Sequence, residues 1–254
     1  MFLSFKNGED DIDTMLSMCI SVLRDNMCEM CAKTSNFFNL LVIVSLASLC
    51  VGSKFADGKE TRVIRIAMIG DSLTQGFGLM PEDNLVSQLQ MRVLAENYPI
   101  ELLNFGVSGD TTSGGLARLD WTISSDISGV VIILGGNDML RGIPPEHSYQ
   151  NLKNMIIKAD TRDLPILLVG MTASNNFGSD YKVAFDKVFE RLRDEFNLFY
   201  YENFFKALDQ DNIPLFLSFM QSDGIHPNSK GVKKIIDGFY PTFQNFVRHI
   251  SNID

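Results

Sequence analysis

Short apolar runs alternate with longer amphipathic segments from residue 63 to the end of the chain. The run Val130-Val131-Ile132-Ile133-Leu134 has no polar residue, which is typical of a parallel strand buried on both faces. The alternation predicts an α/β fold, a three-layer α/β/α sandwich with a mainly parallel five-stranded sheet and right-handed crossovers. Asn228 or Ser229 is the expected cap of the last helix. The predicted strands span 63–69, 100–105, 129–134, 165–169 and 198–201, and the predicted helices span 84–97, 115–123, 149–159, 180–196 and 230–250.

The composition is that of an ordinary soluble globular chain. Of its 254 residues, 45% are hydrophobic and 21% are charged, which argues against a disordered chain and against a multi-span membrane protein. Its 22 basic and 31 acidic side chains give a formal net charge of −9. Binding to nucleic acid or to anionic lipid depends on clustered Lys and Arg, so we expect no nucleic-acid partner.

The N-terminal part differs in character from the rest. Residues 37–51 form an apolar run without charge. This run is shorter than the about 20 residues that span a membrane but fits the core of a signal peptide. We therefore expect an N-terminal extension, 1–53, with a signal-peptide-like or anchor segment at 37–51, and one domain, 54–254. The protein is then exported after cleavage behind Ser53, or, as the main alternative, held at a membrane through 37–51.

Two further expectations concern this extension. A lipoprotein cut before Cys50 is less favoured, because the bulky Leu49 stands where a small residue is needed. A signal core normally lies close to the initiator. We therefore hypothesise that translation starts at Met27 or Met30 and that the residues before them are upstream sequence or a tail.

The cysteines do not predict a disulfide framework or a metal site. All four, Cys19, Cys28, Cys31 and Cys50, lie in the extension, so the 54–254 domain has none. Cys28 and Cys31 have the CxxC spacing of zinc and redox sites. Because no second pair and no nearby histidine accompany them, neither role is expected.

Nucleotide and metal chemistry fit the domain poorly. The glycine-rich segment 106–115 lacks the Lys-Ser/Thr ending of a P-loop and the glycine spacing of a dinucleotide fingerprint. The three histidines, His147, His226 and His249, are far apart in the sequence, whereas metal hydrolases place their ligands at short spacing. We expect no cofactor and no metal, and we interpret His147 and His249 as surface or core residues.

Polar, glycine-rich turns follow the first three predicted strands, at 70–74, 106–115 and 135–138. A fourth polar segment, 222–228, precedes the last helix. The carboxyl ends of parallel strands meet at one edge of a sheet, where ligands bind. Any one of these segments, taken alone, is more often an ordinary turn, but four that converge predict a functional site.

Acyl transfer is the chemistry that these residues favour. A serine hydroxyl becomes nucleophilic when a base takes its proton, and the base needs a third group to fix its tautomer. His226 is the candidate base because Asp223 lies three residues earlier, and Ser72 is the candidate nucleophile at a strand end. The Ser72 N–H, the Gly109 N–H and the Asn137 side-chain amide are candidate donors to an oxyanion.

Taken together, these segments resemble the SGNH, or GDSL, hydrolase superfamily. They match four of its sequence blocks in family order, and the resemblance covers about residues 63–250. Its longer strings are also similar to the bacterial group of arylesterases, acyl-CoA thioesterases and lysophospholipases. The blocks are 70–73, 106–110, 135–138 and 223–227, and the longer strings are 108–119 and 135–142.

The resemblance implies a flavodoxin-like fold and a metal-free, cofactor-free catalytic mechanism. It implies Ser72 as nucleophile, His226 as base and Asp223 as the residue that orients the base. It also implies an oxyanion hole of the Ser72 N–H, the Gly109 N–H and the Asn137 amide. The implied substrates are small-molecule esters or thioesters, lipid-like ones among them, and the implied location is the bacterial periplasm.

Two segments bear on substrate choice. The loop 172–178 follows the fourth strand and is expected to flank the acyl site; it differs from the version expected of the most similar relatives. Phe204-Phe205 and Leu215-Phe216 suggest an apolar site wall, although such pairs are more often core.

Two other functions remain open. One is a carbohydrate O-acetyl esterase on the same fold, which needs identical catalytic groups. The other is a catalytically silent exported binding module. The silent module is less favoured because every catalytic group is present. No obligate protein partner is inferred.

Overall fold

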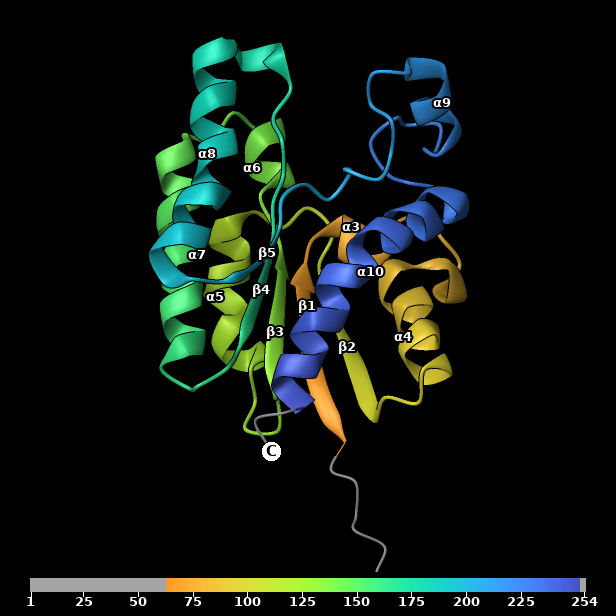
Figure 1. The fold of residues 1–254 in the computed structure, drawn as a ribbon. Helices are drawn as coiled ribbons and strands as arrows, with labels where there is room; N and C mark the ends of the chain where they lie inside the picture. The colour runs from red at the N-terminus through yellow and green to blue at the C-terminus, as the bar shows by residue number, and fades with distance from the viewer. Residues whose placement is uncertain (1–62, 252–254) are drawn as a thin grey trace, which may run out of the picture. The chain divides into compact units, whose positions relative to one another are not determined.

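The structure, a computed structural model, describes residues 63–251. The predicted segment 37–51 and the boundary between 1–53 and 54–254 lie outside the described residues. Five strands alternate with helices along the described part of the chain (Figure 1). The strands are β1 (Ile64–Gly70), β2 (Ile100–Gly106), β3 (Gly129–Ile133), β4 (Ile166–Val169) and β5 (Phe199–Tyr201). The helices are α3 (Ser72–Gln75), α4 (Leu85–Ala95), α5 (Thr112–Thr122), α6 (Gly136–Leu140), α7 (Pro145–Asp160), α8 (Ser179–Phe196), α9 (Ile213–Ser218) and α10 (Ser229–Ser251), with 3-10 turns η1 (Pro81–Asp83) and η2 (Asn175–Phe177).

The five strands form one parallel sheet in the order β2-β1-β3-β4-β5. In this sheet Met68 of β1 lies between Asn104 of β2 and Val131 of β3. The strand order reverses at β1, because β2 lies on one side of it and β3, β4 and β5 on the other. Ligands of such sheets bind outside the carboxyl ends of the two strands at the reversal, which here are β1 and β3.

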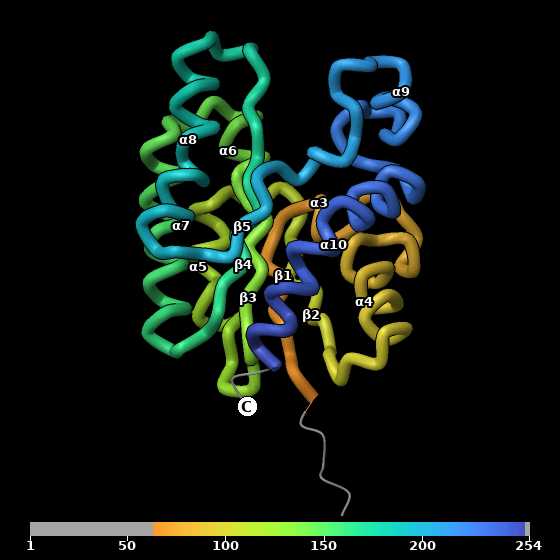
Figure 2. The backbone as a smooth tube through the Cα atoms, in the orientation of Figure 1, coloured from red at the N-terminus to blue at the C-terminus, as the bar shows by residue number. Residues whose placement is uncertain are grey.

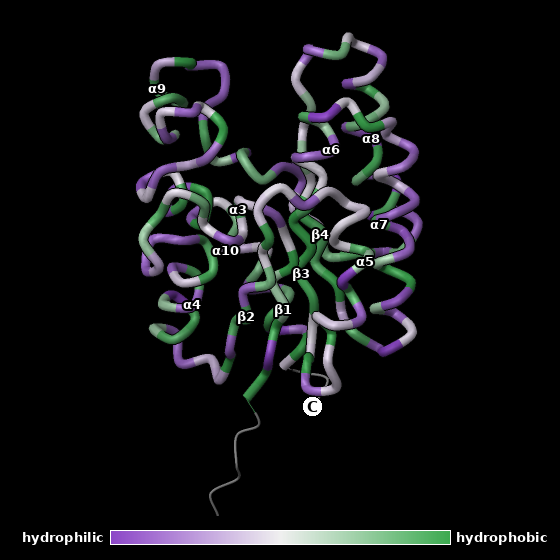
Figure 3. Tube along the Cα trace, turned by 180° about the vertical axis from the view of Figure 1, so that it is seen from behind, coloured by the Kyte–Doolittle hydropathy of each residue, from purple (hydrophilic) through white to green (hydrophobic). Residues whose placement is uncertain are grey.

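Helices cover both faces of the sheet (Figures 1 and 2). α5, α7 and α8 lie on one face, and α4 and α10 lie on the other. Every residue of β3 and β4 is buried, and the tube coloured by hydropathy shows these strands as apolar (Figure 3). The predicted three-layer α/β/α fold is confirmed, and the described sheet is wholly parallel.

The long helix α10 buries one apolar face. Phe239, Phe243 and Phe246 repeat at helical spacing and are at most 3% exposed, so they face the sheet as an amphipathic helix requires. At the start of α10, the side-chain oxygen of Asn228 accepts the Gly231 N–H at 3.0 Å and caps the helix as predicted. None of the helices within residues 63–251 is both long enough and apolar enough to cross a bilayer.

The five long helices were predicted, with small differences at their starts. α5 begins at Thr112 rather than at 115, because the side chain of Thr111 accepts the Gly114 N–H and caps the helix earlier. α7 begins at Pro145 rather than at 149, since proline is well tolerated in a first helical turn. The short helices α6 and α9 were not predicted.

A buried polar cluster ties the loops after β2 and β3 together. Asp138, on α6, is completely buried. Its carboxylate accepts the Thr112 N–H at 2.8 Å, the Thr112 hydroxyl at 2.5 Å and the Ser148 hydroxyl at 3.0 Å. The Thr112 hydroxyl in turn accepts the Asn151 amide at 3.0 Å. The cluster therefore fixes α6 against the starts of α5 and α7.

We expect Asp138→Ala to lower the free energy of unfolding by about 2–4 kcal/mol, because Thr112 and Ser148 would lose their buried acceptor. Urea denaturation followed by circular dichroism measures this change. Asp160→Ala, at the exposed end of α7, is the control and should stay within about 0.5 kcal/mol of the parent. Equal stability of the two variants would contradict a structural role of the cluster.

Candidate active site

The candidate residues meet at the edge of the sheet where the strand order reverses. Ser72 is the first residue of α3 and comes two positions after the end of β1. Gly109 lies in the loop after β2, and Asn137 lies on α6 after β3. Asp223 and His226 lie between α9 and α10. The structure thus brings together all five residues that the sequence singled out.

Three side chains form a continuous hydrogen-bonded chain. His226 Nε2 lies 2.8 Å from Ser72 Oγ, across 154 positions of sequence. His226 Nδ1 lies 2.7 Å from Asp223 Oδ2. Both distances are those of good hydrogen bonds, so a proton can pass from the serine hydroxyl to the imidazole.

The Asp223 carboxylate is held by its own loop. Its Oδ1 accepts the backbone N–H groups of Ile225 at 2.9 Å and of His226 at 3.0 Å. The His226 N–H, the His226 ring and the Ile225 N–H lower the pKa of Asp223 to about 2, because each donor favours the ionised carboxylate. Asp223 is therefore an anion at any neutral pH.

The loop that carries Asp223 and His226 is tightly built. The Gln221 N–H donates to the His226 carbonyl at 2.7 Å, and Met220 forms an antiparallel bridge with Pro227. Gly224 has φ +67°, a left-handed conformation that glycine adopts without a steric penalty. The Gln221 side chain reaches the Phe77 carbonyl at 2.8 Å and thereby ties this loop to the segment that follows Ser72.

Two of the candidate oxyanion donors belong to residues that line a pocket and are unpaired in the described part of the chain. Among residues 63–251, the backbone N–H groups of Ser72 and Gly109 have no hydrogen-bond acceptor. Gly109 has φ +83°, and its carbonyl accepts a hydrogen bond from the Arg141 guanidinium at 2.8 Å. Arg141 therefore holds the turn that presents the Gly109 N–H.

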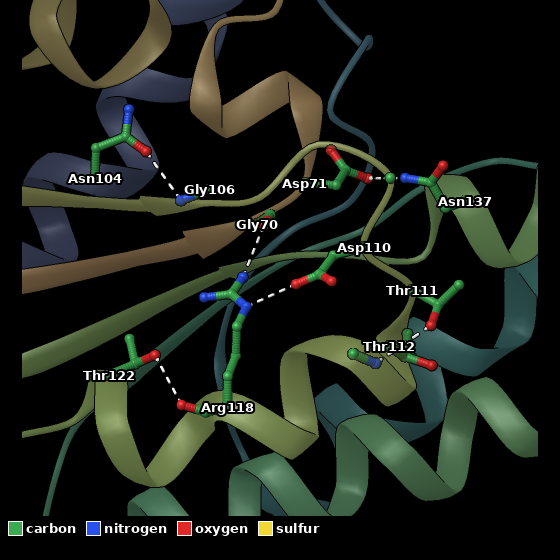
Figure 4. Close-up of polar contacts among 12 residues, drawn as sticks. Gly70, Asp71, Asn104, Gly106, Asp110, Thr111, Thr112, Arg118, Thr122 and Asn137 are labelled. Carbon is green, nitrogen blue, oxygen red and sulfur yellow. Dashed lines mark hydrogen bonds and ion pairs between the residues drawn. The ribbon is translucent and has the colours of Figure 1, made fainter.

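Asp71 fixes the third donor. Its Oδ2 accepts one amide hydrogen of Asn137 at 3.2 Å (Figure 4), and its Oδ1 accepts the Leu73 N–H at 3.0 Å. An asparagine amide has two N–H donors, and the second one of Asn137 has no acceptor among residues 63–251. Asp71 is 1% exposed, and burial raises its pKa to about 6 although both hydrogen bonds oppose the shift.

Arg118 joins the end of β1 to the loop after β2. From α5, its Nε donates to Asp110 Oδ2 at 2.6 Å and its Nη2 donates to the Gly70 carbonyl at 3.0 Å (Figure 4). Sequence reasoning assigned no role to Arg118, Arg141 or Asp71. The signal for Asp71 was its place directly before Ser72 at a helix start, where an aspartate caps the helix.

A pocket of about 730 Å³ opens beside Ser72 and His226. Ser72, Gly109, Asn137 and His226 line it, whereas His147 and His249 do not. Most of its remaining wall is apolar, as in typical small-molecule sites. The apolar part of the wall comprises Leu73, Phe77, Met139, Leu140, Met171, Ala173, Phe205, Phe216, Met220 and Ile225.

The two segments expected to bear on substrate choice have mixed outcomes. The loop after β4 does flank the site, since Thr172, Ser174 and Asn176 line the pocket. Of the aromatic pairs, Phe205 and Phe216 also line it. The preference for core is correct for Phe204, which is 2% exposed, and wrong for Leu215, which is 43% exposed.

Lys182 and Asp186 of α8 hold the loop after β4 in place. The Lys182 ammonium donates to the Ala173 carbonyl at 2.8 Å and to Asp186 at 2.7 Å, and Asp186 accepts the Ala173 N–H at 2.8 Å. Lys182 also lines the pocket. Within residues 63–251, no three His, Cys, Asp or Glu side chains gather as a set of metal ligands.

Comparison of the sequence with known proteins shows which family the chain resembles. The model of the GDSL-like lipase/acylhydrolase family matches residues 68–234. Esterase TesA of Pseudomonas aeruginosa is 33% identical over 187 residues, which are 70% of this chain and 87% of that protein. Thioesterase 1/protease 1/lysophospholipase L1 of Escherichia coli is 29% identical over 73% of this chain and 86% of that protein.

Solved structures agree with the sequence comparisons. A crystal structure of TesA aligns with a TM-score of 0.66 at 32% identity, over 72% of this chain and 99% of that chain. Esterase EstA from Pseudoalteromonas aligns with a TM-score of 0.65 at 29% identity, over 72% and 98% of the two chains. The chain therefore belongs to the GDSL-like lipase/acylhydrolase family.

Proposed function

We propose that this protein is a serine esterase that hydrolyses carboxylic esters or thioesters through an acyl-enzyme on Ser72. The observation that carries the proposal is the chain of short hydrogen-bond distances from Ser72 through His226 to Asp223. Relatives named esterase, thioesterase/lysophospholipase and arylesterase support an ester-bond hydrolase.

In the proposed mechanism, His226 is the base. With its Nδ1–H donated to Asp223, its Nε2 accepts the Ser72 proton while Ser72 Oγ attacks the substrate carbonyl carbon. The imidazolium then gives that proton to the leaving alcohol or thiol as the carbon–oxygen or carbon–sulfur bond breaks. A water molecule, deprotonated by His226, attacks the acyl-enzyme and releases the acid and Ser72.

The negative charge that develops on the substrate oxygen needs donors that are already in place. We assign this role to the N–H groups of Ser72 and Gly109 and to the Asn137 amide. Asp71 then acts as a positioning residue, since it accepts one hydrogen of Asn137 at 3.2 Å and leaves the other for the oxyanion. Arg141 plays the corresponding part for the Gly109 turn.

The pocket wall favours an apolar substrate. More of the pocket lining is apolar than polar, and Phe77, Phe205 and Phe216 are part of it, so we favour esters and thioesters with an apolar acyl or alcohol part over acetylated carbohydrate. We also propose that the protein is exported, which rests on the character of residues 37–51 alone.

Replacement of the nucleophile tests the proposed function. We expect Ser72→Ala to lower the turnover of p-nitrophenyl butyrate at least about 10³-fold, because no acyl-enzyme can form. A fluorophosphonate probe should label the parent at Ser72, as mapped by mass spectrometry, and leave the variant unlabelled. Labelling at another residue, or turnover of an acetylated oligosaccharide but not of the butyrate, would contradict the proposal.

Removal of one oxyanion donor should affect chiefly the chemical step. We expect Asn137→Ala to lower kcat about 10²–10³-fold with little change in KM, because the lost interaction forms only in the transition state. Steady-state kinetics measure both constants. Asn154→Ala, at an exposed position of α7, is the control and should keep the parent values. A rise in KM at constant kcat would instead assign Asn137 to ground-state binding.

The raised pKa of Asp71 gives a prediction about stability and pH. Between its ordinary pKa of 3.8 and its folded pKa of about 6, the folded state keeps a proton that the unfolded state has released. The protonated Asp71 therefore contributes stability that is present below about pH 4 and is lost as the pH rises through about 6. Asp71→Asn cannot titrate and lacks this dependence.

We expect the unfolding free energy of the parent, relative to that of Asp71→Asn, to fall by about 3 kcal/mol between pH 4 and pH 7. Urea denaturation of both proteins across this range measures the difference. The subtraction removes the contribution of the other titrating groups. A difference that does not vary with pH would show that Asp71 is not protonated in the folded state near pH 5.

A further inference from the structure

Helix α9 is apolar and yet exposed. Ile213 is 57% exposed, Leu215 43% and Leu217 51%. Ile213 and Leu217, four positions apart, share one face of the helix, whereas Leu215 lies on another, so α9 presents apolar side chains in more than one direction. A helix that is apolar all round is normally buried. Among residues 63–251, about half of each of these three residues stays uncovered.

The exposed side chains of α9 continue into the wall of the pocket. Phe216 of the same helix lines the pocket. Leu217 packs beside Gly224, and Gly224 also lines the pocket. A methyl carbon of Leu217 lies 3.9 Å from the position that a Cβ atom on Gly224 would occupy. Across the pocket, α6 stands at the same end of the sheet as α9 (Figure 1).

Three residues that line the pocket are themselves half exposed. Phe77 is 51% exposed, Leu140 49% and Ile225 46%. Single exposed apolar side chains are common and need no explanation. A group of them beside a pocket marks an interaction surface. We call this group the apolar rim; it consists of Phe77, Leu140, Ile213, Leu215, Leu217 and Ile225.

The charged residues near the apolar rim indicate which kind of surface the rim can bind. No Lys or Arg occurs between Lys206 and Lys230, whereas Asp209 and Asp211 directly precede α9. Basic residues are what attract a protein to anionic lipid. The α9 segment has no basic residue, so it has no electrostatic attraction to an anionic membrane.

Two cations lie on the side of the pocket opposite α9: Lys182, which lines the pocket, and Arg141, which follows the rim residue Leu140. The Arg141 guanidinium donates to the Gly109 carbonyl, and the Lys182 ammonium is bound to Asp186 and to the Ala173 carbonyl. Asp186 balances the charge of Lys182, and the single charge of Arg141 stands against Asp209 and Asp211 before α9, so the surroundings of the rim are not cationic. The rim therefore fits a surface that has an apolar interior and carries no net charge where it meets water.

We propose that the apolar rim docks this protein on a neutral or zwitterionic lipid–water interface, from which the ester substrate enters the pocket. The proposal rests on the proposed function, since the ester that enters is the one Ser72 cleaves. Docking buries the side chains of α9 in the acyl region. A second copy seated on the rim would instead cover the pocket mouth and block the substrate.

A tryptophan reporter tests docking at the rim itself. The chain has one tryptophan, Trp121, which is 89% exposed on α5 and does not line the pocket. In the full chain with Ser72→Ala, we compare the emission of Trp121 with that of the variant Trp121→Phe/Leu217→Trp. The probes are phosphatidylcholine vesicles, with and without brominated acyl chains. Because each reporter is local, membrane binding by residues 37–51 does not imitate docking at α9.

We expect phosphatidylcholine vesicles to shift the emission of the Leu217→Trp reporter to the blue and brominated chains to quench it, while Trp121 stays unchanged. Absence of this shift would overturn the docking proposal, and hydrolysis of p-nitrophenyl butyrate would then still support the proposed function. A stronger shift with phosphatidylglycerol would overturn the choice of a neutral surface. A blue-shifted emission before vesicles are added would show that another segment or a second copy covers the rim, and would also overturn it.

Activity gives a second readout. We expect Ile213→Ser/Leu217→Ser to lower the ratio of turnover of a long-chain ester in phosphatidylcholine vesicles to turnover of dissolved p-nitrophenyl butyrate by about tenfold. Met91→Ser/Leu94→Ser removes two equally exposed apolar side chains from α4 and is the matched control. An equal loss in both variants, or in neither, would contradict docking at the rim.

Discussion

The hydrogen bond between His226 Nε2 and Ser72 Oγ depends on almost every other part of the fold. One hydrogen bond contributes about 1 kcal/mol to stability, so it cannot itself bring together residues 154 positions apart. The sheet fixes Ser72 at the end of β1. The start of α10 and the bridge between Met220 and Pro227 fix His226. The scaffold therefore meets the entropic cost of alignment before any substrate arrives, which is the form of preorganisation that catalysis uses.

Three aspartates near this bond differ in environment and therefore in what they do. Asp223 is partly exposed and accepts two backbone N–H groups, so it stays ionised. Asp71 is buried with fewer donors, and its pKa rises to about 6. Asp138 is also buried, and its three hydrogen bonds from Thr112 and Ser148 join neighbouring loops. The same side chain can thus orient a base, position an amide or fix a loop, as its donors and burial dictate.

The fold, and the meeting of the five candidate site residues at one edge of the sheet, were predictable because their signals are local motifs placed by strand order. Apolar runs such as the one through Val130 specify buried strands, and strand order brings their carboxyl ends together. Asp71, Arg118 and Arg141 were missed for a physical reason. Their roles consist of contacts to Asn137, Gly70 and Gly109, across tens of positions. No periodicity in the sequence encodes such contacts, although Asp71 could have been found as a helix cap.

The apolar residues in and before α9 show what the sequence alone does not predict. Phe204, Leu215 and Phe216 are equally apolar, yet one is core, one is exposed and one lines the pocket. Hydrophobicity states only that a side chain gains by leaving water; which surface receives it depends on the tertiary structure. Natural sequences depart from their local rules mainly at functional sites. The half-exposed apolar helix α9 beside the pocket is such a departure, and docking on a lipid surface, as proposed, would let an apolar substrate reach the serine without first dissolving in water.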